Sequence, residues 1–159
     1  MRKRFLLDIF ELLNSIVMSI PIHVTRKLLM KILIQKLGYS NCFLRHIRMH
    51  TSWRIRIGSD CVINEHVMLD GRNGLELGDS VDIGEYVTIW TQQHSVDFYH
   101  RVCGGKVIIL DHVWIAPRSI ILPGLIIGEG SAVATGSIVT KNVSPMTLVA
   151  GVPANQFAF

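Results

Sequence analysis

The N-terminal part of the chain carries apolar residues at helical spacing. Between residues 5 and 37 two stripes recur at intervals of three and four positions, which places their side chains on one face of an α-helix. The first consists of Leu6, Ile9, Phe10, Leu13, Ile16, Val17 and Ile20, and the second of Leu28, Leu29, Ile32, Leu33 and Leu37. Pro21 lies between the stripes and Gly38 follows the second, so we expect two helices that end near these residues.

From residue 57 the apolar period changes to six. The repeating aliphatic positions, here called anchors, are Ile57, Ile63, Leu69, Leu77, Ile83, Ile89, Ile109, Ile115, Ile121, Ile127, Val133 and Val139. A small or polar residue usually follows each anchor, and a small or β-branched residue lies four places past it. Six residues suit one short strand and a corner, and three such edges make a triangular coil whose anchors stack in columns. We expect the small residue after each anchor to serve a tight corner, where glycine tolerates unusual dihedrals.

The pattern therefore predicts an all-β solenoid of hexapeptide repeats over 57–159, one structural unit, preceded by a helical cap and lead-in over 1–56. The count breaks between Leu69 and Leu77 and between Ile89 and Ile109, so the chain should loop out near 71–74 and over 91–106. A long loop that interrupts a rigid solenoid is a common place for functional residues.

Charge is divided between the two segments. Residues 1–56 contain eleven Lys and Arg but only the acids Asp8 and Glu11, and the remainder carries a net negative charge. Four of the cations, Arg26, Lys27, Lys31 and Lys36, oppose the second apolar stripe. These helices admit two interpretations: a cap over the open end of the solenoid, with solvated cations, or a basic amphipathic element in peripheral contact with an anionic membrane. We favour the cap. The basic segment shows no nucleic-acid-reading motif, so nucleic acid is not an expected partner.

The three cysteines do not indicate a metal site or a disulfide framework. Cys42, Cys61 and Cys103 have no metal-ligand spacing, and an odd, scattered set points to a reducing compartment, so we expect a cytoplasmic location. The opening residues MRKRFLL are similar to a signal-peptide n-region, but Asp8 and Glu11 interrupt the apolar run that follows. No stretch reaches the roughly 18 uninterrupted apolar residues of a spanning helix.

The repeats resemble a known enzyme family. The likeness covers residues 57–154 and is carried by IGSDCVINEHVMLD, LGDSVDIGEYVTIWTQQHS and DHVWIAPRSIILPGLIIGEGSAVATGSIVTKNVSPMTLVAGVPA. These stretches resemble the hexapeptide-repeat acyltransferases, and within them the sugar O-acetyltransferase branch of maltose, galactoside, nodulation and colanic-acid-type enzymes. The resemblance implies a left-handed parallel β-helix, a homotrimer with active sites between subunits, and acetyl-CoA as donor with no metal required. It implies transfer of an acetyl group to a hydroxyl of a sugar or polysaccharide precursor.

Acetyl transfer to a hydroxyl needs a base, and a histidine can accept the proton at neutral pH. Among seven histidines, His94 follows VTIWTQQ where the regular coil gives way to the long loop, and the family pattern holds its catalytic histidine there. His66 and His100 are weaker alternatives. Polysaccharide-modifying relatives often have His-Asp at this place, whereas Ser95 follows His94 here. Asp97 follows two positions after Ser95 and could orient the imidazole or contact the acceptor, or it could be a solvated loop carboxylate.

The resemblance also implies residues for the acceptor and the donor. Asn64 falls where galactoside-type enzymes place an acceptor-binding asparagine, although an amide there could simply turn the corner. Asp70 and Arg72 could line the acceptor pocket, but Arg72 replaces the acid of that branch. The positions where relatives contact coenzyme A are Ala116, Pro117, Ala134, Thr135, Thr140 and Lys141. Trp114 could pack against the pantetheine arm or within the trimer interface, and Lys141 could meet the phosphates or be a solvated corner residue. Relatives often carry a cation after the final GxPA, where this chain has Asn155, and Arg118 is a candidate substitute.

Three alternative functions can be compared with this interpretation. A zinc carbonic anhydrase on the same solenoid would need three histidines between subunits, which the spacing of His66, His94, His100 and His112 does not fit. A non-catalytic solenoid module is a second alternative. The third is an acetyltransferase with a serine-like or antibiotic acceptor.

Overall fold

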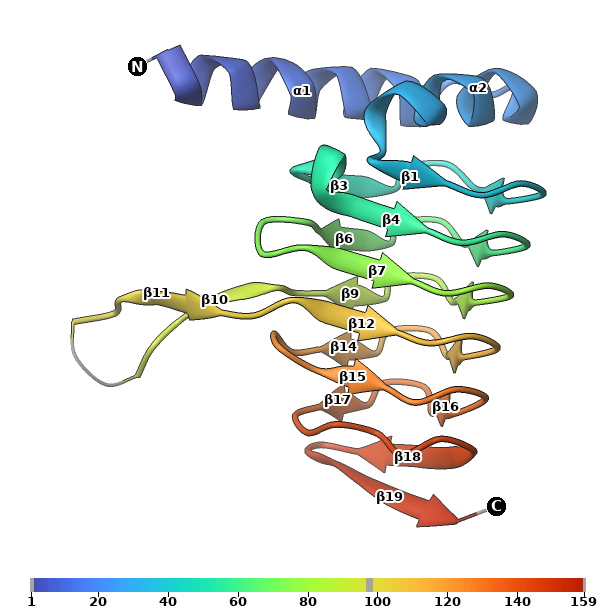
Figure 1. The fold of residues 1–159 in the computed structure, drawn as a ribbon, viewed down its shortest axis with the longest axis vertical. Coiled ribbons are helices and arrows are strands. Elements are labelled where there is room, and N and C mark those ends of the chain that lie inside the picture. Colours follow the sequence, from blue (N-terminus) through green and yellow to red (C-terminus); the bar gives the residue numbers. More distant parts are fainter. Residues whose placement is uncertain (1, 97–98, 159) are drawn as a thin grey trace.

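The chain folds into a three-sided β-solenoid with two helices across one end (Figure 1). The computed structural model describes residues 2–96 and 99–158, and the side chains of 8–96 and 99–157. Short parallel strands stack coil upon coil and form three faces. Since each coil contributes one strand to each face, the predicted all-β solenoid is confirmed.

The three faces are built from strands that recur in order along the chain. The first face contains β1 (Lys36–Leu37), β4 (Ile55–Ile57), β7 (Leu75–Leu77), β12 (Val107–Ile109) and β15 (Ile126–Ile127). The second contains β2 (Cys42–Phe43), β5 (Val62–Ile63), β8 (Asp82–Ile83), β13 (Trp114–Ile115), β16 (Ala132–Val133), β18 (Thr147–Gly151) and β19 (Ala154–Ala158). The third contains β3 (Arg48–His50), β6 (Met68–Asp70), β9 (Thr88–Ile89), β14 (Ile120–Ile121) and β17 (Ile138–Val139).

The strand register aligns the anchors into three buried columns. On the first face, Ile57 pairs with Leu77 and Leu77 with Ile109, and the other faces repeat the arrangement. Every predicted anchor is buried, as is every small or β-branched residue four places past an anchor. The interior of the prism is therefore a continuous aliphatic core, whose burial is the main stabilising contribution.

The glycines after the anchors have a different role from the predicted one. The left-handed backbone conformation occurs three places past the anchor, and residues with side chains adopt it there, including Asp60, His66 and Tyr86. The glycines after the anchors instead lie where successive coils approach each other. A Cβ on Gly84 would lie 2.7 Å from the Pro117 nitrogen of the next coil. Close packing of the coils, rather than an unusual dihedral, explains the small residue.

The solenoid begins earlier than the repeat pattern indicated. Strands β1 to β3 already form a coil, with Leu37, Phe43 and Met49 paired to Ile57, Ile63 and Leu69 of the next coil. These residues keep the six-residue period, but a 3₁₀ turn at Ser52–Arg54 shifts the phase before Ile57. The coil therefore starts inside the segment that the sequence interpretation assigned to the cap and lead-in, and Leu37 belongs to a strand rather than to a helix.

The helical cap is present, and its packing differs in detail from the prediction. Helix α1 (Arg2–Ser19) and helix α2 (His23–Leu33) lie across the first coil (Figure 1). Arg26, predicted on the solvated face, is buried and donates hydrogen bonds to the carbonyl oxygens of Ile20 and, at 2.9 Å, of Phe43. The guanidinium thus supplies donors to carbonyl groups at the open end of the stack and after the end of α1.

The long predicted loop is an antiparallel excursion from the regular coil. Strand β10 (Gln92–His94) leaves the third face and pairs with β11 (Val102–Gly104), which returns the chain to β12. Figure 1 shows this excursion projecting sideways from the prism. At the far end, β18 and β19 form an antiparallel pair on the last coil. No helix in the described part of the chain is long and apolar enough to cross a membrane.

Candidate active site

His94 lies on β10, where the excursion leaves the corner between the third and first faces. Its Nδ1 lies 2.7 Å from the backbone carbonyl oxygen of His100. A carbonyl oxygen can only accept, so Nδ1 carries a hydrogen and donates the hydrogen bond, and the tautomer with this contact has its lone pair on Nε2. The backbone of the excursion thus fixes the tautomer that a general base requires. The side chain is exposed, so the ring is accessible from solvent.

A cavity of about 410 Å³ opens beside His94. Its lining comes from three parts of the chain that the coil brings together: Arg72 from the short loop, Trp90, Gln92, Gln93, His94 and Val102 around the excursion, and Leu122 and Pro123 from the next coil. Sequence analysis nominated only His94 and Arg72 of this set. The stacking of Ile121 on Ile89 is the signal that places Leu122 and Pro123 next to Trp90.

Asp70 holds Arg72 in place at this cavity. The carboxylate is fully buried, and its Oδ1 accepts from the Arg72 backbone N–H and Nε, both at 2.9 Å. Its Oδ2 accepts from the Arg72 guanidinium at 3.0 Å and from the Thr91 backbone N–H at 3.0 Å. The guanidinium carbon also lies 5.7 Å from the centre of the Trp90 ring. Such a bidentate pair gives Arg72 one geometry and restricts its mobility.

The same contacts determine the acidity of Asp70. Burial by itself would raise the pKa of this carboxyl group. The hydrogen bonds from the Arg72 side chain and backbone and from Thr91, together with the Arg72 charge, outweigh burial and lower its pKa below the ordinary value. Asp70 is therefore a charged, buried support for the cavity and not one of its lining residues.

The other predicted acceptor residues do not join this cavity within one chain. Asn64 lies at the corner between the second and third faces, where its Nδ2 donates to the Ile83 carbonyl at 2.8 Å and to Asp82 Oδ1 at 3.3 Å. These contacts link successive coils, as the corner-turning interpretation expects. Asp97 lies outside the described residues. Of the alternative bases, His100 contributes its backbone carbonyl to His94, and His66 stacks between His46 and Tyr86.

The predicted donor-binding residues fall at two corners of the prism. Trp114 is half exposed on the second face, and Ala116 and Ala134 follow anchors at the corner between the second and third faces. Pro117 and Thr135 come next at that corner, with Ala116 buried and Thr135 exposed. Thr140 and Lys141 are exposed one coil beyond Leu122, at the corner that carries His94. Arg118 is exposed, and its guanidinium lies 5.7 Å from the Tyr86 ring centre.

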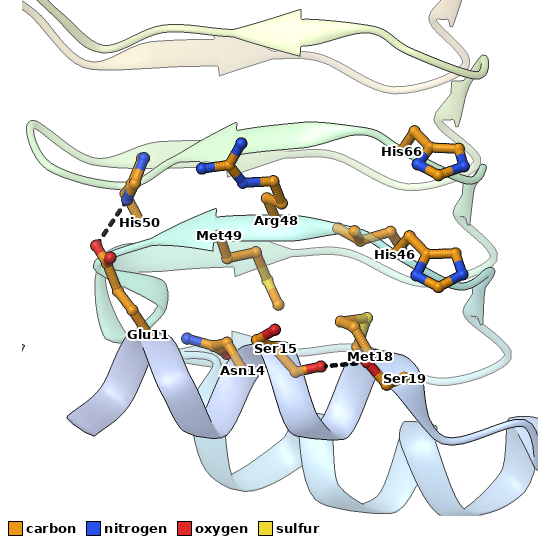
Figure 2. Close-up of a pocket in the computed structure, with 11 residues that line it drawn as sticks. Glu11, Asn14, Ser15, Met18, Ser19, His46, Arg48, Met49, His50 and His66 are labelled. Atoms are coloured by element: carbon orange, nitrogen blue, oxygen red, sulfur yellow. Dashed lines mark hydrogen bonds and ion pairs between the residues drawn. The ribbon is translucent and has the colours of Figure 1, made fainter. Parts of the chain in front are cut away.

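A second cavity of about 410 Å³ lies between α1 and the first two coils (Figure 2). Its polar lining includes His46, Arg48 and His66 from the coils and Ser15 from the helix. Glu11 of α1 contacts His50 Nδ1 at 2.7 Å, which links the helix to the solenoid. Within the described residues, no group of three or more His, Cys, Asp or Glu side chains could hold a metal ion.

Comparison with solved structures decides the family. The hexapeptide-repeat-containing acetyltransferase VCA0836 from Vibrio cholerae superimposes with a TM-score of 0.90 at 31% identity, over 99% of this chain and 92% of that chain. The chain belongs to the hexapeptide-repeat acetyltransferases. The Vibrio protein has also been solved in complex with acetyl coenzyme A, and that structure matches with a TM-score of 0.88 over 96% of this chain and 86% of the other. A maltose O-acetyltransferase from Clostridium difficile matches at 25% identity with a TM-score of 0.81, over 96% and 84% of the two chains.

Curated relatives are acetyltransferases of greater length. A putative acetyltransferase of Schizosaccharomyces pombe is 40% identical over 84 residues, which is 50% of this chain and 41% of the relative. The galactoside O-acetyltransferase of Escherichia coli is 34% identical over 103 residues, which is 62% of this chain and 51% of the relative. This hexapeptide-repeat chain thus spans about half the length of the curated relatives it matches. No family model matches it.

Proposed function

We propose that this protein transfers the acetyl group of acetyl-CoA to a hydroxyl of a sugar or polysaccharide precursor, with His94 as general base. The observation that carries the proposal is the hydrogen bond from His94 Nδ1 to the His100 carbonyl, because it selects the tautomer in which Nε2 is the acceptor, beside a cavity. Family membership and the acetyl coenzyme A complex of the Vibrio relative support the donor. The galactoside and maltose O-acetyltransferases among the relatives support a sugar acceptor.

The residues at the cavity suit this chemistry. His94 Nε2 accepts the proton of the acceptor hydroxyl while the oxygen forms its bond to the acetyl carbon. When the carbon–sulfur bond breaks, the proton passes from Nε2 to the departing sulfur, and the imidazole returns to its starting state. Arg72 uses Nε and one terminal nitrogen to bind Asp70, and the remaining N–H groups of its planar guanidinium would bind acceptor hydroxyl or anionic groups. Trp90 offers an apolar surface on the same side of the cavity.

The proposal includes a homotrimer in which each site is shared. The predicted donor residues Trp114, Ala116 and Ala134 lie away from the corner that carries His94, so one chain does not bring both halves together. A neighbouring protomer that turns its second face toward His94 would supply the missing half. Thr140 and Lys141, on the corner of His94, would then contact the donor from the first protomer, with Lys141 near its phosphates.

The test is thiol release from acetyl-CoA with a panel of acceptors: galactosides, glucosides, serine and an aminoglycoside. We expect turnover with sugars, and His94→Ala should lower it about 10²- to 10⁴-fold, the usual contribution of a positioned base. His112→Ala, which removes another exposed histidine, is the matched control and should retain turnover. Equal background release by all three proteins would indicate a non-catalytic module. Turnover with serine or the aminoglycoside alone would reject the sugar acceptor.

A further inference from the structure

The two cap helices expose apolar side chains on the side turned away from the solenoid. On α2, Val24, Leu28 and Ile32 follow one another at intervals of four, and Ile32 is 80% exposed. On α1, Leu12 and Ile16 have the same spacing, and Leu12 is 60% exposed. The outer cap surface is defined as the exposed apolar residues of this segment: Ile9, Leu12, Leu13, Ile16, Ile22, Val24, Leu28 and Ile32.

This surface is not needed for capping. Helix α1 contacts the solenoid through Asn14, Val17 and Met18, and Asn14 Nδ2 donates to Ser52 Oγ at 3.2 Å. Helix α2 buries Met30 and Leu33 on its inner side. The apolar side of α1 is thus wider than the part that contacts the solenoid. Ile9, Leu13 and Ile16 of the predicted apolar stripe are exposed. Exposed apolar side chains that recur along one side of a helix in this way indicate an interaction site.

The charge beside the outer cap surface is positive. Lys27 and Lys31 lie one helical turn apart on α2, and each is adjacent to a residue of the apolar stripe. Among residues 1–56 the only acids are Asp8 and Glu11, and Glu11 is engaged with His50 on the solenoid side. An apolar stripe flanked by lysines is the pattern of helices that lie in the interface of an anionic bilayer.

We propose that the outer cap surface docks on a lipid bilayer containing anionic headgroups, with both helices lying flat and the solenoid projecting from the membrane. Figure 1 shows both helices across the same end of the stack, so one membrane plane can run along both of them. A second copy of the chain is the less suitable occupant. Self-association through this surface would bring the lysines of one copy close to those of the other, and the like charges would repel. Anionic lipid headgroups would attract the same lysines.

The experiment is flotation of the full chain with vesicles of phosphatidylcholine alone or mixed with phosphatidylglycerol. We expect binding to the mixed vesicles that weakens with added salt. Leu28→Ser together with Ile32→Ser should lower binding by about tenfold or more, since two aliphatic side chains no longer enter the interface. Replacing Lys27 and Lys31 by Gln should lower it by about fivefold for each lysine. All of these side chains lie outside the packed core, so the variants should fold.

The matched control is Val152→Ser, which removes a similarly exposed aliphatic residue at the opposite end of the chain and should bind like the parent. Three results would overturn the proposal: failure to float with either vesicle, equal loss in Val152→Ser, or binding that ignores the phosphatidylglycerol content. Sedimentation velocity without lipid adds a fourth. Concentration-dependent assembly that Leu28→Ser and Ile32→Ser abolish would assign the surface to a second copy.

Discussion

At the scale of single residues, polar contacts within the two loops hold the residues around the cavity in place. Asp70 fixes Arg72, and the Asn73 side chain donates to the Thr91 carbonyl at 2.7 Å, so the short loop and the start of the excursion are tied together. The carbonyl of His100 does the same for the imidazole of His94. Cys61 differs: its thiol is buried in the core, desolvation raises its pKa, and it is therefore an unreactive packing residue.

Asp70→Asn tests this support. The amide cannot accept from four N–H groups, so we expect the free energy of unfolding at neutral pH to fall by roughly 1–3 kcal/mol. Because folding lowers the pKa of Asp70, its contribution is complete above the unfolded-state pKa of about 3.9 and is lost as the pH falls through the folded-state pKa. Urea unfolding of both proteins between neutral and acid pH should show the difference shrink below about pH 4.

The exposed carboxylate Asp60 provides the control, since Asp60→Asn should leave stability unchanged at each pH. A difference between Asp70→Asn and the parent that persists unchanged into strong acid would contradict the electrostatic explanation.

At the scale of elements, the coil repeats because each corner lets the next coil approach closely. The corner glycines, among them Gly58, Gly78 and Gly84, have no room for a Cβ, since backbone of the adjacent coil fills that position. The left-handed turn residues form a separate column, and at one corner this column stacks His46, His66 and Tyr86 with ring centres 5.2 and 4.8 Å apart. The residues at the corners therefore determine how closely successive coils pack, as well as where the chain turns.

Gly84→Ala should show how tightly the coils pack. The new methyl group would lie 2.7 Å from the Pro117 nitrogen and 2.8 Å from its Cδ, so a backbone shift is required. Overpacking of this kind destabilises by about 1–3 kcal/mol, which thermal or urea unfolding can measure. Ala134→Gly, at the same corner position two coils away, controls for the change in chain flexibility and should lose less. A Gly84→Ala protein as stable as the parent would show that the corner is more adaptable than its geometry implies.

At the scale of the whole molecule, the proposed site is divided into two halves on different corners of one chain, which the proposed homotrimer would bring together. In this proposal Trp114 and the small corner residues near it form one half, and His94 forms the other. In a cyclic trimer the same pair of half-sites would meet three times. The helical cap lies at one end of the stack, away from the β10–β11 excursion that carries His94 (Figure 1).

Subunit mixing checks this arrangement. His94→Ala and Trp114→Ala should each be nearly inactive alone, whereas co-refolded mixtures should regain activity, since about a quarter of the sites would combine two intact halves. Light scattering should give three times the chain mass of 17.9 kDa for each protein. Mixtures no more active than the separate variants, in the presence of confirmed mixed trimers, would place both halves in one chain.

The sequence by itself determined the features that depend on short-range periodicity. Six-residue spacing fixes which side chains turn inward, so the buried columns, the breaks near 71–74 and 91–106 and the position of His94 at the edge of the coil all follow from it. The same period at Leu37, Phe43 and Met49 was hidden by the phase shift at Ser52–Arg54.

Only the tertiary structure decided which groups meet across coils. An amphipathic stripe predicts that a helix has an apolar side. Which part of the helix packs depends on the shape of the solenoid end, and in this structure Arg26 is buried there while Leu28 is exposed. Likewise, the Asp70–Arg72 pair and the His100 carbonyl beside His94 depend on the conformations of two loops, which no repeat encodes. Such contacts form only when folding brings the loops together, and the spacing of residues along the chain does not predict them.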